Sequence, residues 1–249
     1  MTKETAISPV AVSLLLDGEA KPDARAVRVL SRSAREMLGF AITADAPSDA
    51  DRLELLCMGL TFDLTGLGTK GHVSQPEVDR LLGLAESFDP NDCRSLRLQP
   101  ASHILCGRFP LPVIRMLAGL AAELARLDDV LAVVWEPSGT CMSPAAFAAA
   151  VRPWLAGGAF PVSRLTTLVR EPGGALRSRG LACLAGYEVE LAGSPDETPL
   201  QRAAQMAAVV QRIADLGHGG DLGFLAEFGL SVASAPEAGV NLLRLSGAA

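Results

Sequence analysis

Apolar and polar positions follow two different patterns at the start of the chain, and these predict a strand and then a helix. Residues 10–16 are a run of β-branched residues and leucines that ends at Asp17-Gly18, a pattern typical of a buried strand. Residues 23–38 instead place apolar residues three or four positions apart, and Gly39 follows them. A proline just before this segment suits a first helical position, so we expect an amphipathic helix.

The rest of the first hundred residues predicts two further elements and a boundary. Residues 53–64 read as one long strand or as a bulged strand with Gly59 inside, and Pro76 favours the start of a helix that runs to about Ser87. The turn-rich segment SFDPNDCRSLRLQP follows. We expect it to link an N-terminal half, residues 1–95, to a C-terminal half, residues 96–249.

The second half repeats the order of strand, proline-started helix and strand, and then adds hairpins. Its expected elements are a strand at 103–106, a helix at 112–127, a strand at 130–135, a helix that Ser143-Pro144 begins and Pro153 stops, a hairpin turn at Pro172-Gly173, a strand at 187–191, a helix at 199–216 and a closing hairpin of 224–233 with 240–245. Interleaved strands, helices and hairpins predict an α+β fold, with two ferredoxin-like halves (α/β plaits) and mixed or antiparallel sheets.

Composition indicates a reducing compartment. The 249 residues can bury enough surface to fold without a metal or a disulfide, and 49% of them are apolar. Five cysteines, an odd number without a CxxC pair, favour free thiols. The apolar run near the start lacks a signal cleavage pattern, and no stretch reaches membrane-spanning length. We therefore expect a soluble cytoplasmic protein with no membrane association. Three of the 22 basic residues are lysines, which suggests GC-rich codons and a bacterial source.

Charge argues against binding to nucleic acid. The net charge is -6, and acidic residues outnumber basic ones on both sides of residue 100. One basic stripe stands out on the helix expected at 23–38, formed by Arg25, Arg28, Arg32 and Arg35. A solvated outer face accounts for this stripe, with a weak anion or nucleic-acid contact as the alternative. Lys70, in a loop, is a further candidate for contact with an anion.

Two motifs look like cofactor or metal sites but lack the required context. Residues 66–71 match GxGxxG, yet the helix expected at Pro76 begins too late to hold a pyrophosphate, so a flexible loop is favoured. Cys93, His103 and Cys106 could suggest a metal site, but His103 and Cys106 would lie on opposite faces of a strand. We expect neither a metal nor a cofactor.

Catalytic candidates are few. Cys141 precedes a helix whose amide dipoles could lower the pKa of its thiol, but a general base such as His103 would have to lie beside it. Glu188 shares a strand face with Glu190, roughly 7 Å apart if the strand is regular. A structural interpretation competes at both positions. Cys141 would be a quiet loop cysteine, and Glu188 would lie on a solvated strand face.

The C-terminal half carries a series of short motifs: Ser178-Arg179-Gly180-Leu181, Gly186, Glu188 and Gly220-Asp221-Leu222-Gly223, preceded by Ser102-His103, Trp135 and Ser143-Pro144. This series resembles an uncharacterised bacterial domain-of-unknown-function family, number 4261 in that series. The resemblance covers residues 10–245 and is strongest in residues 101–245. It implies no activity, cofactor or catalytic residue. Gly180 is then expected to mark a close approach or a bulge, and Gly186 a turn between strands.

The sequence therefore leads to a main hypothesis and two alternatives. The main one is a non-catalytic binding protein that recognises a protein partner or associates with itself, because surplus apolar surface often marks an interface. The first alternative is a small-molecule-binding protein or an enzyme, with a cleft between the halves that uses His103, Cys141 or Glu188. The second is weak binding of nucleic acid or anions through the Arg25–Arg35 helix face.

Overall fold

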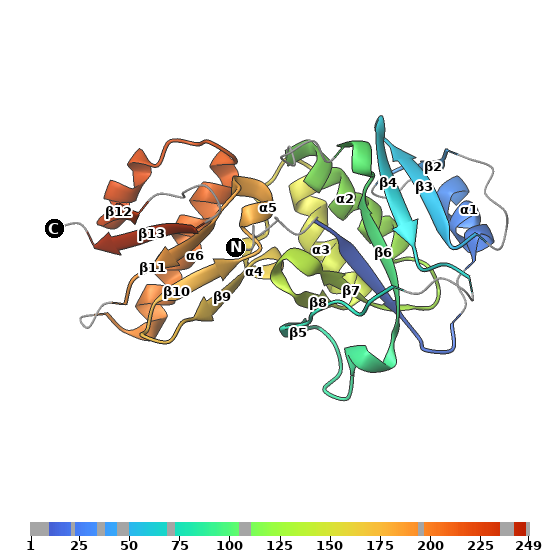
Figure 1. Ribbon diagram of the computed structural model, residues 1–249, viewed down its shortest axis with the longest axis horizontal. Helices are drawn as coiled ribbons and strands as arrows, with labels where there is room; N and C mark the ends of the chain where they lie inside the picture. The colour runs from blue at the N-terminus through green and yellow to red at the C-terminus, as the bar shows by residue number, and fades with distance from the viewer. Residues whose placement is uncertain are drawn as a thin grey trace, which may run out of the picture. The chain divides into compact units, whose positions relative to one another are not determined.

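The structure is a computed structural model that describes residues 10–20, 23–33, 38–43, 50–68, 73–104, 111–193, 197–234 and 242–247. The chain divides into two compact units, an N-terminal unit that runs to Gly158 and a C-terminal unit that begins at Ala159. Each unit combines one β-sheet with helices, so the fold is α+β, as expected (Figure 1).

The described part of the N-terminal unit holds an eight-stranded sheet in the order β2-β3-β4-β6-β1-β7-β8-β5. Its strands are β1 (Val12–Leu16), β2 (Ala41–Ile42), β3 (Arg52–Cys57), β4 (Leu60–Thr65), β5 (Arg80–Leu82), β6 (Arg94–Pro100), β7 (Val130–Trp135) and β8 (Thr140–Met142). Neighbouring strands are antiparallel except β5 and β8, which are parallel, so the sheet is mixed.

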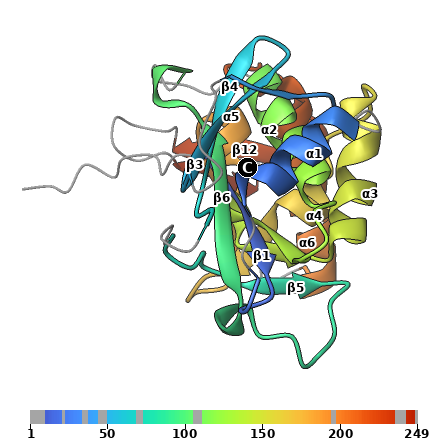
Figure 2. The same cartoon turned by 90° about the vertical axis from the view of Figure 1, so that its right-hand side faces the viewer.

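Strand β1 lies at the centre of this sheet, between β6 and β7, and all five of its residues are buried. Three helices lie on the same side of the sheet: α1 (Ala24–Ser33), α2 (Leu111–Leu124) and α3 (Pro144–Leu155) (Figure 2). Side chains of Ser13 and Leu15 point to the opposite face from those of Leu14 and Leu16. Leu15 belongs to a buried apolar cluster against which Val78, Leu84 and Phe88 pack.

The expected long strand at 53–64 is instead a hairpin of β3 and β4. Met58 and Gly59 form its turn and both adopt positive φ angles, 49° and 80°. A positive φ at both central residues is the geometry of a two-residue turn between twisted strands. Gly59 therefore reverses the chain and does not lie inside one continuous or bulged strand.

The expected helix from Pro76 to Ser87 is wrong. Residues 73–79 have no regular structure, and the short strand β5 follows them and pairs with β8. Gly83 then adopts a positive φ of 66°, which ends the strand. Burial of the apolar side chains Val78, Leu84 and Phe88 against the sheet decides this conformation, and it overrides the local signal of a proline at a helix start.

The boundary expected near residue 95 falls inside β6, and the compact units divide after Gly158 instead. Strand β6 pairs with both β1 and β4, so the segment taken for a linker crosses the middle of a sheet. Buried Leu96 and Leu98 alternate with Arg97 and Gln99 there, the pattern of a strand with unlike faces. The strand expected at 103–106 is wrong for its first two residues, because Ser102–Ile104 form a short 3-10 helix, and residues 105 and 106 lie outside the described residues.

The described part of the C-terminal unit holds a five-stranded sheet in the order β12-β13-β11-β10-β9. The strands are β9 (Thr167–Arg170), β10 (Leu176–Arg179), β11 (Glu188–Leu191), β12 (Leu230–Ser234) and β13 (Leu242–Gly247). Strands β11 and β13 are parallel and the other pairs are antiparallel. The helices α4 (Val162–Leu165), α5 (Ala182–Ala185) and α6 (Pro199–Leu216) complete the unit.

Local signals placed several of these elements correctly. Helix α6 has the predicted bounds, because Thr198 and Gln201 form a capping box at its start and Gly217 ends it. The amide of Gly174 donates to the carbonyl of Glu171 at 3.0 Å, which confirms Pro172 and Gly173 at the centre of the β9–β10 turn. In the closing hairpin, the first strand begins later than expected because Gly223–Phe228 form a 3-10 helix.

Candidate functional site

His103 and Cys141 belong to the N-terminal unit, but the structure does not bring them together. His103 is exposed, and its Nε2 lies 2.7 Å from the hydroxyl of Thr61 on β4. Cys141 is on β8, and three strands separate β8 from β4 in the sheet. At about 4.8 Å per strand the two strands are about 19 Å apart, so His103 cannot act as a general base for Cys141.

The environment of Cys141 also opposes a nucleophilic role. Its side chain is fully buried and packs in the cluster that includes Leu15, Cys93 and Val134. Burial, with a smaller effect of the nearby Cys93, raises the pKa of the Cys141 thiol to about 12. The thiol is therefore protonated near neutral pH, and its surroundings favour a quiet cysteine, although it lies in the buried strand β8 and not in the expected loop.

Glu188, the third candidate, is the acceptor in a compact hydrogen-bond network of the C-terminal unit. Its carboxylate accepts bonds from the hydroxyl of Ser178 at 2.6 Å and from the amide of Gly180 at 2.8 Å. The amides of Leu181 and Ala182 add bonds of 3.2 Å and 3.1 Å. These donors come from the end of β10 and the start of α5, so Glu188 closes the connection between β10 and β11.

Burial raises the pKa of Glu188 above its usual value, and the bonds from Ser178 and the three amides act in the opposite direction. Gly180 and Gly186, with φ angles of 97° and 85°, supply the left-handed turns on either side of α5. The turn expected at Gly186 is confirmed, whereas Gly180 lies in a left-handed turn after β10, where a close approach or a bulge was expected. Cys183, between them, is buried and donates to the carbonyl of Gly180 at 3.1 Å. The Glu188 carboxylate therefore has a structural role, because it accepts its hydrogen bonds from its own chain.

The arginine stripe is partly visible on α1. Val27 and Leu30 are buried, while Arg25 and Arg32 are exposed on the other side of the helix and Arg28 is half-buried. Arg35 and Lys70 lie outside the described residues. Arg25 and Arg126 line a hollow of about 500 Å³ in this unit, but Asp23, Asp128 and Asp129 line it as well, so carboxylates outnumber guanidinium groups there. Carboxylates in the same hollow oppose an anion there.

The described part of the GxGxxG segment contacts its own chain. The guanidinium of Arg94 donates to the carbonyl of Gly66 at 3.0 Å, to the carbonyl of Gly68, and to that of Ala20 at 3.3 Å. A phosphate-binding loop offers amide N–H groups to its ligand, whereas this loop presents carbonyl oxygens to an arginine. Thr69 to His72 lie outside the described residues, and so does Cys106 of the supposed metal set.

Within the described ranges, no group of three or more histidine, cysteine, aspartate or glutamate side chains is arranged to hold a metal ion. Cys57, Cys93, Cys141 and Cys183 are all buried free thiols. In the same residues no helix combines the length and the apolar character needed to cross a membrane.

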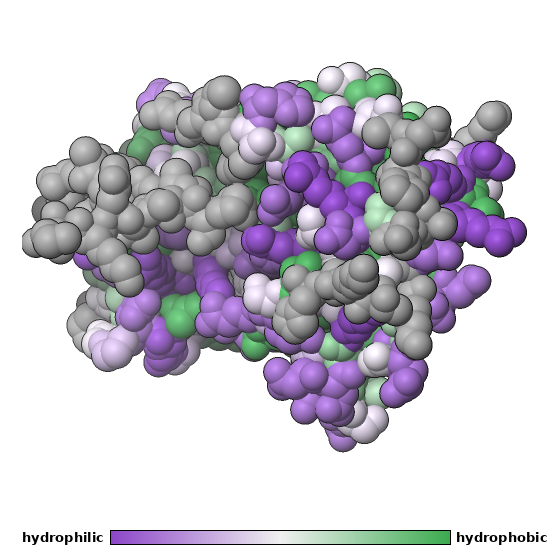
Figure 3. Space-filling model, turned by 45° about the vertical axis from the view of Figure 1, so that its right-hand side comes forward, coloured by the Kyte–Doolittle hydropathy of each residue, from purple (hydrophilic) through white to green (hydrophobic). Residues whose placement is uncertain are grey.

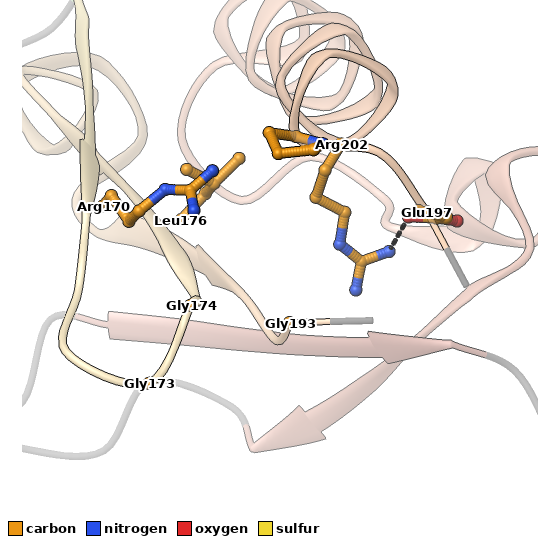
Figure 4. A pocket seen from close by; sticks show the side chains of 8 residues that line it. Arg170, Gly173, Gly174, Leu176, Gly193, Glu197 and Arg202 are labelled. Atoms are coloured by element: carbon orange, nitrogen blue, oxygen red, sulfur yellow. Dashed lines mark hydrogen bonds and ion pairs between the residues drawn. The ribbon is translucent and has the colours of Figure 1, made fainter. Parts of the chain in front are cut away.

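The C-terminal unit contains a pocket of about 400 Å³ that sequence reasoning missed (Figure 4). It lies between the β9–β10 hairpin, the chain after β11 and the first turn of α6. Its described lining is Arg170, Gly173, Gly174, Leu176, Gly193, Glu197, Pro199 and Arg202. The volume is within the range of small-molecule sites in proteins.

The register of the hairpin places one wall of this pocket. Arg170, the last residue of β9, pairs with Leu176, the first residue of β10, so their side chains share a face of the sheet. The hairpin tip approaches the chain after β11 so closely that a Cβ on Gly193 would lie 3.4 Å from the carbonyl oxygen of Gly173. Glycines at these positions leave this side of the pocket without side chains.

Arg202 forms the opposite wall and is fixed in place. Its side chain is almost fully buried, and it donates to the carbonyl of Ala192, to the carboxylate of Glu197 at 2.6 Å and to the side-chain oxygen of Gln205 at 3.1 Å. Arg170 differs, because it is exposed and contacts no acceptor among the residues that the structure describes. The pocket thus contains one neutralised guanidinium and one that is available to a ligand.

The signals for this pocket are scattered along the chain. Arg170 and Arg202 are far apart in the sequence, and neither belongs to a recognised motif. The Pro-Gly-Gly turn and the start of α6 are both visible in the sequence, but nothing local shows that they adjoin. Strand register and helix packing bring them together.

Comparisons with known proteins provide no relative for this chain: no family model, no curated protein and no solved structure matches it. The geometry of the pocket is therefore the basis for the function proposed next.

Proposed function

We propose that this chain is a non-catalytic binding protein and that its ligand is a small molecule held in the C-terminal pocket. The observation that carries the proposal is a pocket of about 400 Å³ beside Arg170, whose guanidinium contacts no acceptor in the described part of the chain. An arginine that lacks a partner at the edge of a concave site is a typical group for fixing the orientation of a ligand.

The surroundings of the sequence-predicted catalytic residues support binding over catalysis. Cys141 is buried and its pKa is raised to about 12, and Glu188 accepts four hydrogen bonds from its own chain. His103 lies across the sheet from Cys141. Each of these groups has a structural role in its present position.

The proposal is tested by nuclear magnetic resonance of the full chain with a library of small anionic, neutral and cationic compounds. We expect at least one compound to shift the amide signals of Gly173, Gly174 and Gly193, which line the pocket, and to leave Gly139 of the N-terminal unit unchanged. If no compound of any charge shifts the three pocket glycines, or if every active compound moves Gly139 equally, the pocket is not the binding site.

A protein partner or self-association, the main hypothesis from the sequence, stays a prediction. It is favoured by the β3–β4 hairpin, where Leu56 is 38% and Met58 78% exposed. Met58 also holds a left-handed conformation that methionine rarely adopts, and such strain is often found at functional positions. Elsewhere, on the face drawn in Figure 3, apolar residues form small separate patches among hydrophilic ones.

Self-association is measured by light scattering during size-exclusion chromatography. A dimer that Met58→Asp converts to a monomer would support this second function. A wild-type chain that is strictly monomeric at high concentration contradicts it.

Several finer expectations stay predictions as well. They are membership of the domain-of-unknown-function family, the ferredoxin-like plait of each half, a bacterial source, a cytoplasmic location, and weak nucleic-acid or anion binding through the Arg25–Arg35 helix face. The parallel β11 and β13, with α6 between them in the chain, support the plait in the C-terminal unit. Binding through the arginine face would weaken steeply as salt is added.

A further inference from the structure

We infer that the C-terminal pocket binds the oxyanion of a small molecule, a carboxylate or a phosphate group, with Arg170 as its main contact. This inference depends on the proposed function, since it specifies the chemistry of a ligand for the same pocket. It follows from the charges, the geometry of the guanidinium groups and the position of α6.

The charges of the described lining leave a net positive pocket. Its charged side chains are Arg170, Arg202 and Glu197. Glu197 pairs with Arg202 at 2.6 Å, so these two charges largely cancel. The remaining charge is that of Arg170, and an anionic ligand would compensate it.

The position of Arg170 suits an oxyanion that can offer two oxygens to one guanidinium. Its side chain and that of Arg202 extend into the same space from β9 and from α6 (Figure 4). A guanidinium offers parallel N–H groups that match two oxygens of a carboxylate or phosphate. Arg202 is held by Ala192, Glu197 and Gln205, so it stabilises the wall of the site while Arg170 contacts the ligand.

Helix α6 adds a further favourable field. Pro199, its first residue, lines the pocket, so the N-terminal end of this 18-residue helix, which carries a positive partial charge, lies beside the ligand space. Gly173 and Gly174 contribute no side chain that could obstruct the approach of the ligand. Leu176 and Pro199 supply apolar surface for the remainder of the molecule.

The test uses three simple probes, inorganic phosphate, acetate and acetamide, with the pocket glycine amides as the readout. Acetamide has nearly the shape of acetate but no charge. We expect phosphate and acetate to shift the amides of Gly173, Gly174 and Gly193 in a saturable way and acetamide to have little effect. Comparison of phosphate with acetate shows which oxyanion the pocket prefers.

Two arginine variants provide the matched comparison. Arg170→Ala should weaken binding of the preferred anion about 10- to 100-fold, the usual effect of losing charge-assisted hydrogen bonds. Arg177→Ala should leave binding unchanged, because Arg177 is an exposed arginine on the adjacent strand whose side chain points to the opposite face of the sheet.

The outcomes separate this inference from the proposed function. Acetamide binding as tightly as acetate, or Arg170→Ala binding phosphate as tightly as the wild-type chain, overturns the oxyanion inference. If neutral or cationic compounds shift the pocket glycines and no anion does, the pocket is a binding site of other chemistry, and only the inference fails. If nothing shifts them, both fail.

Discussion

The hydroxyl of Ser178 donates a hydrogen bond of 2.6 Å to the carboxylate of Glu188 and accepts one of 2.8 Å from the amide of Val189. A side chain at the end of β10 thus bonds to two consecutive residues at the start of β11. The same carboxylate accepts the amides of Gly180, Leu181 and Ala182, which would otherwise be donors without partners at the start of a short helix. One half-buried carboxylate therefore fixes the whole connection.

Replacement of Glu188 by glutamine should destabilise the C-terminal unit by about 2 kcal/mol. The glutamine side chain keeps one oxygen that accepts hydrogen bonds. Its NH₂ group is itself a donor, so it cannot accept hydrogen bonds from the backbone N–H groups that it faces. Native-state hydrogen exchange of the amides of Ala182 and Val189 measures the effect. Glu190→Gln is the control, since Glu190 forms a partly exposed ion pair with Arg244, and its loss should cost about 0.5 kcal/mol or less. Equal effects of the two variants would contradict the structural role of Glu188.

Stability at alkaline pH should depend on Cys141. Burial raises the pKa of this thiol from 9.0 to about 12, so above pH 9 the folded chain keeps a proton that the unfolded chain loses. Stability that is fully present below pH 9 is therefore lost as the pH rises, by about 1.4 kcal/mol per pH unit for this thiol. Cys141→Ala removes the titrating group and should give a shallower decline.

Urea unfolding followed by the fluorescence of Trp135 and Trp154, both in the N-terminal unit, measures this slope. Between about pH 7 and pH 8 the difference between wild type and Cys141→Ala should be constant, because the thiol is protonated in both states. Curves that stay parallel to about pH 10.5 would show that the thiol of Cys141 is reached by solvent in the native state.

Gly66 should tolerate a side chain much less well than Gly59. Both glycines have positive φ angles, 93° and 80°. A Cβ on Gly66 would lie 2.6 Å from the carbonyl oxygen of Ser95, whereas a Cβ on Gly59 meets nothing within 4 Å. Gly59→Ala therefore reports the backbone strain alone, about 1 kcal/mol, and Gly66→Ala should cost about 2 kcal/mol more. The same tryptophan fluorescence measures both, and equal costs would mean that β6 moves aside freely.

The elements that the sequence predicts well are those with local signals. Thr198, Pro199 and Gln201 mark the start of α6 and Gly217 marks its end, and each acts within one turn of the helix end that it marks. Ser143 caps α3 in the same way, although this helix passes Pro153 and ends at Leu155. A proline in the last turn removes a hydrogen bond without ending the helix at once.

The elements that the sequence predicts badly depend on distant contacts. Pro76 looks like a helix start, but the apolar residues after it pack against β1 and β7. The pocket shows the same limit. Arg170 becomes part of it because β9 pairs with β10 in one register and α6 packs nearby, and no single segment contains that information.

The ion pair between the buried Glu123 and the exposed Arg126 gives the last prediction. The side chain of Glu123 on α2 is fully buried, accepts the amide of Leu38 at 3.0 Å and pairs with Arg126 at 3.0 Å. Arg126→Met removes the opposite charge from a buried carboxylate and should destabilise the N-terminal unit by about 3 kcal/mol. The double variant Glu123→Gln with Arg126→Met keeps an acceptor for Leu38 and removes both charges, so it should regain most of that loss. Urea unfolding of the single and double variants decides the point: a double variant that is less stable than Arg126→Met would mean that the Glu123 carboxylate stabilises the fold through its other contacts even without the arginine.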